Sequence, residues 1–491
     1  MIHSVILLLS VIILKCTPKE CYFSAEQKRE LRCTGLNTTY TKSTIFATLK
    51  KDKAQPKGVN SLWIEKSNIS NISLKSTDLP QLTWLHLANV NISLSSDDYF
   101  KEFPQLLYLD IISSKIEDLP KGIFGNFKSL EVLALSRNLL KVINPDLFQN
   151  LRLLRTLRLY DNKLNTIENG FLKPLKKLKR LYLQENEITI ISSIAFTGLN
   201  SLLELWLANN KIERLWSSTF VHLMQLQELH LEGNLIDDIH QSAFKGLNSL
   251  DMLQLASNKI QVILPNTFVD LIQLKELDLT GNLLEDIDSN AFVGLKKLKS
   301  LYLDYNKLKT VSAKALEKLG ELVHLKLTGN NIERLEKDTF AQLKKLFTLD
   351  LSINKIHELP TKVFFSNNQV YRLYLTSNKI AAIPENLFSD KNELSYLYLK
   401  NNKISEIEYN SVKNLRQLIS IDLSYNELKT FNGSVFANSF GMQSIQLENN
   451  YISNLSLTDF KQFNKLDTVD IKDNPLPHEI VEEFEKKYYG I

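Results

Sequence analysis

The stretch Leu154-Arg-Thr-Leu157-Arg-Leu159-Tyr-Asp-Asn162-Lys-Leu164 decides the fold, because its frame of leucines and one asparagine returns every 24 residues. The asparagine recurs fifteen times in succession, from Asn138 to Asn474. A strict period of this length is typical of a solenoid, in which each turn copies the last and contacts only its neighbours. The period therefore predicts stacked turns, and it directs the functional question to surface recognition.

Each repeat is expected to contain a short strand followed by a sharp turn. In the repeat quoted above, Leu157 and Leu159 are the inward residues of the strand, because side chains alternate between the two faces. The asparagine amide carries both donors and acceptors, so it is expected to satisfy backbone groups in its own and the next turn. Val90 stands at this position in the second repeat and cannot do so, which marks that repeat as irregular.

A second column runs in steps of 24 residues from Phe100 to Phe484, and fourteen of its seventeen positions are phenylalanine. The exceptions are Leu172, Leu316 and Val412. Each ring buries a large apolar area, so the column predicts an aromatic core on the convex side of the turns.

The same frame predicts the organisation of the chain. Eighteen repeats occupy residues 59–476, and the first three lack the asparagine. Residues 17–58 are expected to form an N-terminal cap. Residues 477–491 are expected to form a helical C-terminal cap, because apolar residues recur there at helical spacing among charged ones.

The pattern Leu-x-x-Leu-x-Leu-x-x-Asn-x-Leu, followed by an apolar residue, Phe and Leu, resembles the "typical" extracellular leucine-rich repeats. That family includes Toll-type receptor ectodomains, chaoptin-like adhesion proteins, proteins like the acid-labile subunit, and secreted insect immune proteins. The resemblance implies an α/β fold: a curved horseshoe with a parallel β-sheet on its concave face and short caps. The chain departs from many relatives because no cysteine follows Asn474-Pro475, and neither a membrane span nor a signalling domain is expected from this sequence. These departures favour a soluble, carrier or co-receptor role over direct transmembrane signalling.

The N-terminus predicts secretion. The run Val5 to Leu14, ten residues that are apolar except for Ser10, fits a signal peptide at 1–16 and is too short to cross a bilayer. If cleavage follows Cys16, the remaining Cys21 and Cys33 are expected to form a disulfide in an oxidising compartment. If cleavage falls earlier, Cys16 is left to join another chain, and a homodimer stays possible.

Six sequons for N-linked glycosylation fit a secreted, extracellular chain. They are Asn37, Asn68, Asn71, Asn91, Asn432 and Asn454. They lie near the two ends, and two interpretations remain open. Either they arise by chance in an asparagine-rich repeat, or glycans shield the ends and leave the centre open for contact.

The residue between the two strand leucines points out of the concave face, where the family usually binds its partners. This column predicts an aromatic strip of Tyr182, Trp206 and His230. Charged residues flank it: Arg158 and Arg180 on the N-terminal side, and Glu204, Glu228 and Glu232 toward the other. A second cluster consists of Arg372, Tyr374, Tyr396 and Tyr398. Trp63 and Trp84 also occupy outward positions. Aromatic anchors with charged surroundings are typical of interface hot spots, although such residues also simply suit strands.

Lysine follows the asparagine in seven repeats, at Lys163, Lys211, Lys259, Lys307, Lys355, Lys379 and Lys403. This row could bind a heparin-like polyanion or anionic lipid, or it could be a repeated solvent position.

Composition narrows the function further. Apolar residues make up 44%, charged residues 23%, and the net charge is only +4, so nothing indicates nucleic-acid binding. No metal-ligand spacing, nucleophile motif or phosphate-binding loop is present, and neither a cofactor nor catalysis is expected. The primary hypothesis is a secreted protein that recognises an extracellular or cell-surface protein, or a glycan, through its concave face. The alternative is a structural extracellular-matrix protein that acts by self-association, and a hydrolase is a distant third.

Overall fold

The computed structural model describes residues 20–24, 29–36, 41–69, 72, 74–167, 170–488 and 490. The chain divides into two compact units, which are described separately. The first unit contains residues 1–212 and 219–226, and the second contains residues 213–218 and 227–491. The predicted signal peptide at 1–16, Cys16 and the sequons Asn37 and Asn71 lie outside the described residues.

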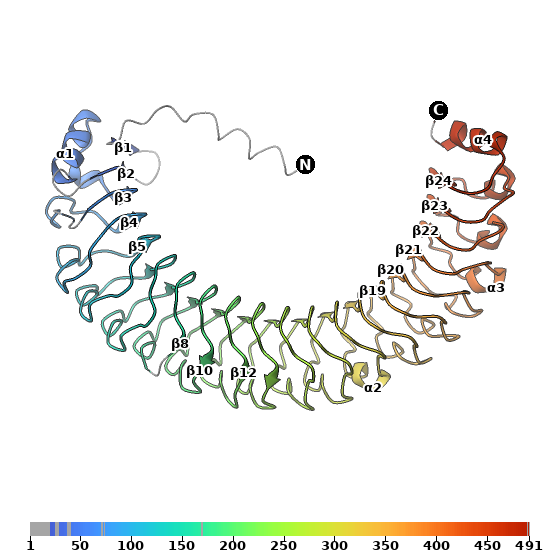
Figure 1. Ribbon diagram of the computed structural model, residues 1–491, viewed down its shortest axis with the longest axis horizontal. Helices are drawn as coiled ribbons and strands as arrows, with labels where there is room; N and C mark the ends of the chain where they lie inside the picture. The colour runs from blue at the N-terminus through green and yellow to red at the C-terminus, as the bar shows by residue number, and fades with distance from the viewer. Residues whose placement is uncertain are drawn as a thin grey trace. The chain divides into compact units, whose positions relative to one another are not determined.

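The first unit is built around a sheet in which one strand from each repeat pairs in parallel with the next (Figure 1). Its repeat strands are β3 (Ser61–Glu65), β4 (Trp84–Ala88), β5 (Tyr108–Ile112), β6 (Val132–Ala134), β7 (Thr156–Arg158), β9 (Arg180–Tyr182) and β11 (Glu204–Trp206). A small parallel pair, β8 (Thr166–Ile167) and β10 (Ile190–Ile191), lies outside this sheet. The other elements belong to the N-terminal region: β1 (Glu20–Ser24), β2 (Glu30–Thr34), α1 (Thr41–Lys51) and η2 (Pro56–Gly58).

The second unit repeats the same design. Its repeat strands are β13 (Glu228–His230), β15 (Met252–Gln254), β16 (Glu276–Asp278), β17 (Ser300–Tyr302), β18 (His324–Lys326), β19 (Thr348–Asp350), β20 (Arg372–Tyr374), β21 (Tyr396–Tyr398), β22 (Ser420–Asp422), β23 (Ser444–Gln446) and β24 (Thr468–Asp470). A second small pair is β12 (Arg214–Leu215) with β14 (Asp238–Ile239). Helical elements are short: α2 (Ala313–Leu316), α3 (Tyr409–Val412), η3 (Gly433–Phe436), η4 (Leu457–Phe460) and the terminal α4 (His478–Tyr488).

Within each unit the strands pair in register with the repeat. Leu277 lies opposite Leu301, and Arg372 lies opposite Tyr396, so residues 24 positions apart become neighbours across the sheet. The predicted leucine-rich solenoid with a parallel sheet is therefore confirmed. Regular helix is sparse, and most of each turn opposite the sheet consists of turns and bends.

The conserved geometry of each turn depends on its asparagine. The Nδ2 of Asn282 donates to the carbonyl oxygens of Leu279 and Leu255, each at 3.0 Å, and its Oδ1 accepts from the Ile260 N–H at 3.1 Å. Leu279 belongs to its own turn, whereas Leu255 and Ile260 belong to the preceding one. The expected role is confirmed, but the expectation that the second partner lies in the next turn was wrong.

Serine takes over part of this role where the asparagine is missing. The Ser114 hydroxyl donates to the Ile112 carbonyl at 2.9 Å and accepts from the Val90 N–H at 3.2 Å. Ser67 makes the equivalent pair of bonds two repeats earlier in the array. The short hydroxyl thus provides part of the bonding that an asparagine at position 114 would give to its own and the preceding turn.

The residue before the asparagine adopts left-handed backbone geometry. Gly281 has a φ of 67°. Residues with side chains also have a positive φ at this position, including Tyr305 and Ile353, each with a φ of 54°. A β-branched residue is rarely found in this region. The repeat therefore imposes the turn even where the local residue disfavours it.

The phenylalanine column forms a buried stack in each unit, as predicted. In the second unit Phe268 is 0% exposed, and its ring centroid lies 5.7 Å from Phe244 and 6.5 Å from Phe292. In the first unit Phe124 stacks with Phe100 and Phe148 in the same way. These rings pack on the leucines of the strands and form one core along the turns of each unit.

Both ends of the array carry elements that differ from the repeat. In the first unit Cys21 and Cys33 form a disulfide between the antiparallel strands β1 and β2, as predicted. In the second unit α4 buries Phe484, whose ring meets Phe460 edge-on at 5.5 Å. The helix therefore covers apolar surface that the last turn would otherwise expose.

Candidate functional site

The residues on either side of the buried leucine in each strand form the outward surface of the sheet, here called the sheet face. Because the strands pair in register, outward residues from consecutive repeats stand about 4.8 Å apart and can touch. Three groups of aromatic and charged side chains gather on this surface, and each is built within one unit.

The first group, called the Trp206 patch, consists of Arg158, Arg180, Tyr182, Glu204 and Trp206 on β7, β9 and β11. The rings of Tyr182 and Trp206 lie 5.9 Å apart. Arg180 Nε donates to Glu204 Oε1 at 2.8 Å, and the Tyr182 hydroxyl donates to the other oxygen at 3.3 Å. Glu204 therefore fixes the positions of an arginine and a tyrosine in the neighbouring strand. The structure brings these predicted residues together.

Burial raises the pKa of the Tyr182 hydroxyl, and the nearby Glu204 carboxylate raises it further. The hydroxyl therefore stays protonated at neutral pH and remains a hydrogen-bond donor. The Arg180–Glu204 pair is partly exposed, so it contributes at most about 1 kcal/mol to stability. Its main effect is to hold the polar groups of the patch in place.

The predicted strip divides between the units, because His230 belongs to the second. Its side chain is buried, with the residue 7% exposed, so it presents less surface than the sequence suggested. The ring nitrogens lie 3.7 Å from carboxylate oxygens of Glu228 and Glu232. The three residues form a polar cluster of their own on β13 and the turn after it.

The second group, called the Arg372 patch, consists of Phe347, Tyr371, Arg372, Tyr374, Tyr396 and Tyr398 in the second unit. Tyr374 and Tyr398 stack face to face, with centroids 4.6 Å apart and planes 5° from parallel. The Arg372 guanidinium carbon lies 5.1 Å from the Tyr371 centroid and 5.3 Å from the Tyr396 centroid. Burial raises the pKa of the Tyr398 hydroxyl, with a further contribution from Tyr374.

Sequence reasoning identified four residues of this patch and missed Phe347 and Tyr371. Their rings stack 5.0 Å apart, and Tyr371 meets Tyr396 edge-on at 5.4 Å. Both stand one residue before a strand, where alternation predicts an inward side chain. Their 24-residue separation was the signal that could have joined them to the patch.

The third group, called the Trp63 patch, lies on β2 to β5 and was not predicted as a site. Trp63 stacks on His86 at 3.9 Å, and Arg32 lies 4.4 Å from the Trp63 centroid. Asp110 Oδ2 lies 2.8 Å from Trp84 Nε1 and 3.0 Å from His86 Nδ1. Trp63, His86 and Asp110 follow one another in the outward column, so the sequence did contain the signal.

The described sequon asparagines are Asn68, Asn91, Asn432 and Asn454, and all four are exposed. Asn91 Nδ2 donates to Asn68 Oδ1 at 3.1 Å, and Asn432 Oδ1 caps η3 by accepting from the Ser434 N–H. Their exposure is what attachment of a glycan requires.

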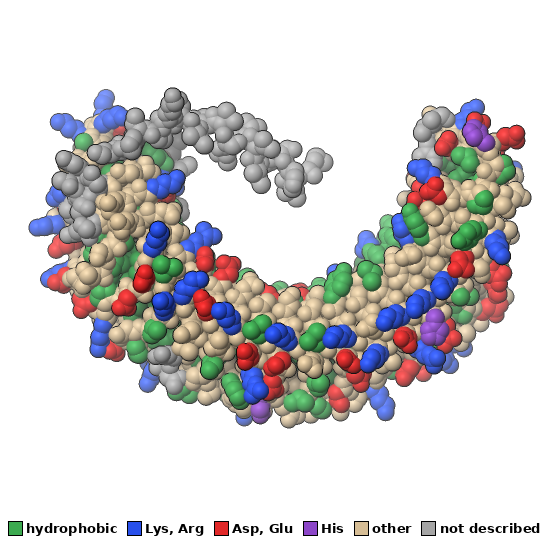
Figure 2. Space-filling model, in the orientation of Figure 1, with side chains coloured by type: hydrophobic (Ala, Val, Ile, Leu, Met, Phe, Trp, Pro, Cys, Tyr) green, Lys and Arg blue, Asp and Glu red, His purple; other side chains and the backbone are tan. Residues whose placement is uncertain are grey.

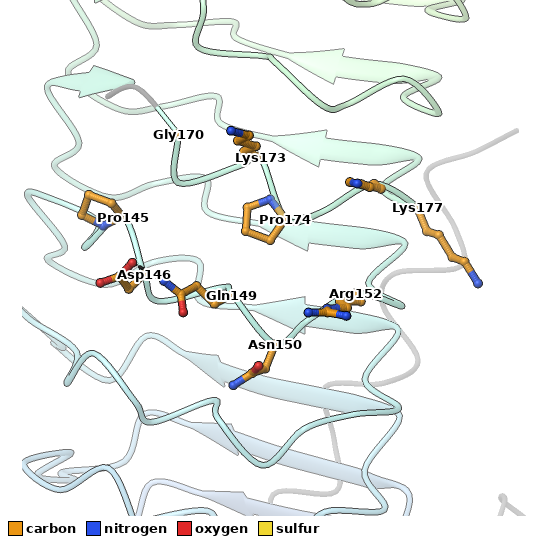
Figure 3. A pocket seen from close by; sticks show the side chains of 10 residues that line it. Pro145, Asp146, Gln149, Asn150, Arg152, Gly170, Lys173, Pro174 and Lys177 are labelled. Atoms are coloured by element: carbon orange, nitrogen blue, oxygen red, sulfur yellow. Dashed lines mark hydrogen bonds between the residues drawn. The ribbon is translucent and has the colours of Figure 1, made fainter.

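A cavity of about 830 Å³ lies away from the predicted residues, between the loops 145–152 and 170–177 of consecutive turns (Figure 3). Its charged lining residues are Asp146, Arg152, Lys173, Lys176 and Lys177. Asp146 is already ion-paired with Lys121. None of the described lining residues has a buried polar atom without a partner, so the cavity does not identify a ligand.

Two further features bear on chemistry. Among the described residues, no group of three or more His, Cys, Asp or Glu side chains is placed to hold a metal ion. Within the same part of the chain, no helix is both long and apolar enough to cross a membrane.

Comparison with protein families identifies the kind of repeat. The leucine rich repeat model matches overlapping segments of the chain at residues 80–139, 104–164, 152–212, 176–236, 224–284, 272–332, 321–380 and 368–428. Together these segments cover well over half of the sequence, and they indicate no catalytic family. No curated protein matches the sequence.

Several solved structures share the fold. A leucine-rich repeat protein of Leptospira interrogans is 25% identical, with a TM-score of 0.64 over 89% of this chain and 96% of that one. Toll of Drosophila, in its complex with Spatzle, is 19% identical, with a TM-score of 0.68 over 94% of this chain and 68% of that one. The plant peptide hormone receptor RGFR1, in complex with RGF2, is 20% identical, with a TM-score of 0.62 over 94% and 72%.

Proposed function

This chain belongs to the leucine-rich repeat family, and we propose that it is a secreted binding protein that recognises an extracellular protein through its sheet face. The fold is one found in ligand-binding receptor ectodomains, and two of the similar structures are complexes with Spatzle and with the peptide hormone RGF2. The disulfide between Cys21 and Cys33 supports an oxidising compartment, and the exposed sequons support a glycoprotein.

The Arg372 patch carries the proposal. Arginine and tyrosine are enriched at the energetic centres of protein interfaces, where they bury large areas and keep a polar group. Here one arginine packs between Tyr371 and Tyr396, beside the stacked pair of Tyr374 and Tyr398. These contacts hold the side chains in one arrangement before a partner arrives, and that reduces the entropy lost on binding.

The Trp206 patch is proposed as a second contact region. Its tyrosine and tryptophan are half-buried, and its polar groups are held by Glu204. Acidic and basic groups lie side by side there, so a partner would need complementary groups of both signs. Among the described residues no carboxylate oxygen lies within 4.0 Å of the Arg372 guanidinium, so this patch favours a partner that brings a carboxylate.

The test is cross-linked capture of extracellular and cell-surface proteins on the secreted chain, followed by affinity measurement with the purified partner. Tyr374→Ala/Tyr398→Ala is expected to weaken binding by about 2 kcal/mol or more, roughly thirty-fold. Tyr182→Ala/Trp206→Ala tests the second region in the same way. Phe440→Ala/Tyr451→Ala, which removes two exposed aromatic rings away from both patches, is the matched control and is expected to bind normally.

Unchanged affinity in both patch variants would refute binding through the sheet face. Capture of further copies of this chain alone, with assembly that depends on concentration, would instead support the structural role in the extracellular matrix. Secretion and folding of each variant are checked by its yield and thermal transition.

A further inference from the structure

The lysines that follow the asparagines differ between the two units in whether they form ion pairs with a carboxylate. In the first unit Glu187 bridges two of them, with Oε2 2.9 Å from Lys211 Nζ and Oε1 3.6 Å from Lys163 Nζ. Other lysines of the second unit are also paired with an acid one turn away, such as Lys309 with Glu285 at 2.9 Å. In these pairs a carboxylate one turn away lies beside the lysine.

The five lysines that follow a repeat asparagine in the second unit are called the lysine row: Lys259, Lys307, Lys355, Lys379 and Lys403. All five are exposed. Among the described residues, no carboxylate oxygen lies within 4.0 Å of any of their amino groups. Figure 2 shows basic side chains following one another over consecutive turns of this unit.

The densest part of the row spans three consecutive turns, at Lys355, Lys379 and Lys403. Adjacent strands lie about 4.8 Å apart, so consecutive lysines of the three project from backbone positions within one Debye length, about 8 Å at physiological salt. Like charges held so close raise one another's energy. A linear polyanion laid along the row would relieve that repulsion and release its counterions.

The columns beside these three lysines carry no charge to oppose an anion. Residues 353, 377 and 401 on one side are Ile, Ser and Asn, and residues 357, 381 and 405 on the other are His, Ala and Ser. Asn401 Nδ2 donates to Ser377 Oγ at 3.0 Å, which shows that side chains in neighbouring turns of this column meet. The row therefore offers hydroxyl and amide groups next to its cations.

This arrangement fits a sulfated polysaccharide better than a nucleic acid. Single-stranded nucleic acids bind where aromatic rings alternate with cations, because their bases stack on the rings. In the three turns of Lys355, Lys379 and Lys403 the neighbouring columns contain no Phe, Tyr or Trp, and rings enter one of these columns only at Tyr305 and Tyr425, outside these turns. Lysine supplies point charges without a fixed fork geometry, and these suit a regular series of sulfate groups. The disulfide also indicates a compartment where such polysaccharides occur.

We propose that the lysine row of the second unit is a binding site for a linear sulfated polysaccharide, separate from the sheet-face patches. The polysaccharide would lie across the turns of the protein, and one lysine would contact one of its acidic groups in each repeat. Binding would then concentrate the protein at surfaces rich in such polysaccharides, independently of whether a protein partner occupies the sheet face.

Heparin is the probe, and its affinity is measured by calorimetry at several salt concentrations between about 50 and 200 mM. The test variant is Lys355→Gln/Lys379→Gln/Lys403→Gln. The matched control, Lys163→Gln/Lys211→Gln/Lys345→Gln, removes three lysines that are ion-paired with Glu187 or Glu321. Both variants change the net charge by the same amount.

Wild type is expected to bind heparin, with a logarithm of affinity that falls linearly with the logarithm of salt concentration. The row variant should lose about two to three units of that slope, because counterion release scales with the number of contacts. The control should keep most of the affinity and slope of wild type. Equal losses in the two variants, or no heparin binding by wild type, would overturn the proposal.

Two further ligands separate sulfate recognition from general charge. Chemically desulfated heparin, which keeps its carboxylates, is expected to bind far more weakly than heparin. A single-stranded oligodeoxythymidine is expected to bind weakly as well. If it bound as tightly as heparin and lost as much in the row variant, the row would be a nucleic-acid site instead.

Discussion

The asparagine ladder supports a quantitative prediction, because its members share their acceptors. The carbonyl oxygen of Leu279 accepts from Asn282 at 3.0 Å and from Asn306 at 2.9 Å. The carbonyl oxygen of Leu255 accepts from Asn282 and from Asn258, each at 3.0 Å. Each leucine carbonyl thus has two donors from consecutive turns.

Asn282→Ala would therefore leave both carbonyls with one donor each. It would fully strip only the Ile260 N–H, which donates to Asn282 Oδ1. An unpaired buried donor costs about 1–3 kcal/mol, and each weakened carbonyl adds about 0.5–1 kcal/mol. Asn282 is 3% exposed, so water cannot easily replace the amide. The expected loss in unfolding free energy is about 2–5 kcal/mol.

The double variant Asn282→Ala/Asn306→Ala should cost more than the sum of the two single variants. It removes both donors to Leu279, whose carbonyl becomes unpaired in the core, and the excess should be about 1–3 kcal/mol. Asn282→Ala/Asn330→Ala is the control. Asn330 donates to Leu303 and Leu327 and shares no carbonyl with Asn282, so those losses should add.

The measurement is hydrogen exchange read by mass spectrometry, together with denaturant unfolding, because repeat arrays open locally before they unfold as a whole. Faster exchange in the double variant should centre on the turns around Leu279. The exposed Asn290→Ala is expected to change stability by less than about 0.5 kcal/mol. Additive losses in the Asn282/Asn306 pair would show that the shared carbonyl is not what couples the turns.

Two further predictions concern the core and its charges. Phe268→Ala should lower the unfolding free energy by about 3–5 kcal/mol, because the ring is fully buried between two others. Val269→Ala, at a partly exposed neighbouring position, is the control. A loss near 1 kcal/mol in Phe268→Ala would mean that the turns collapse around the cavity. Burial raises the pKa of the Asp304 carboxyl, so its ionisation above that pKa disfavours the folded state. In Asp304→Asn the side-chain oxygen can still accept from the Thr328 N–H. This variant should therefore be more stable than wild type at neutral pH. Denaturation at several pH values should show that the gain in unfolding free energy shrinks as the pH falls through the raised pKa. A gain that persists in strong acid would contradict this assignment.

Much of the fold was predictable from the sequence because the repeat makes long-range contacts periodic. Once the 24-residue frame was read, Leu277 opposite Leu301 and Phe244 beside Phe268 followed without knowledge of the coordinates. The turn itself is also dictated by the frame, since Ile353 adopts a left-handed backbone that its own side chain disfavours. The period did not reveal which neighbouring turn each asparagine would bind, because the backbone carbonyl and N–H groups of the preceding and the following turn are equally distant in sequence.

The candidate site was less predictable, and one repeated triplet shows why. Arg180-Leu-Tyr and Arg372-Leu-Tyr occupy the same place in their repeats, yet Arg180 is paired with Glu204 whereas Arg372 packs between two tyrosine rings. The sequence by itself determined the solenoid, its core and the set of outward columns, because those depend on residue type and spacing alone. Only the tertiary structure decided that Phe347 and Tyr371 join the Arg372 patch and that His230 is largely covered. Such outcomes depend on how far each side chain reaches across the turns, and a periodic pattern does not contain that information.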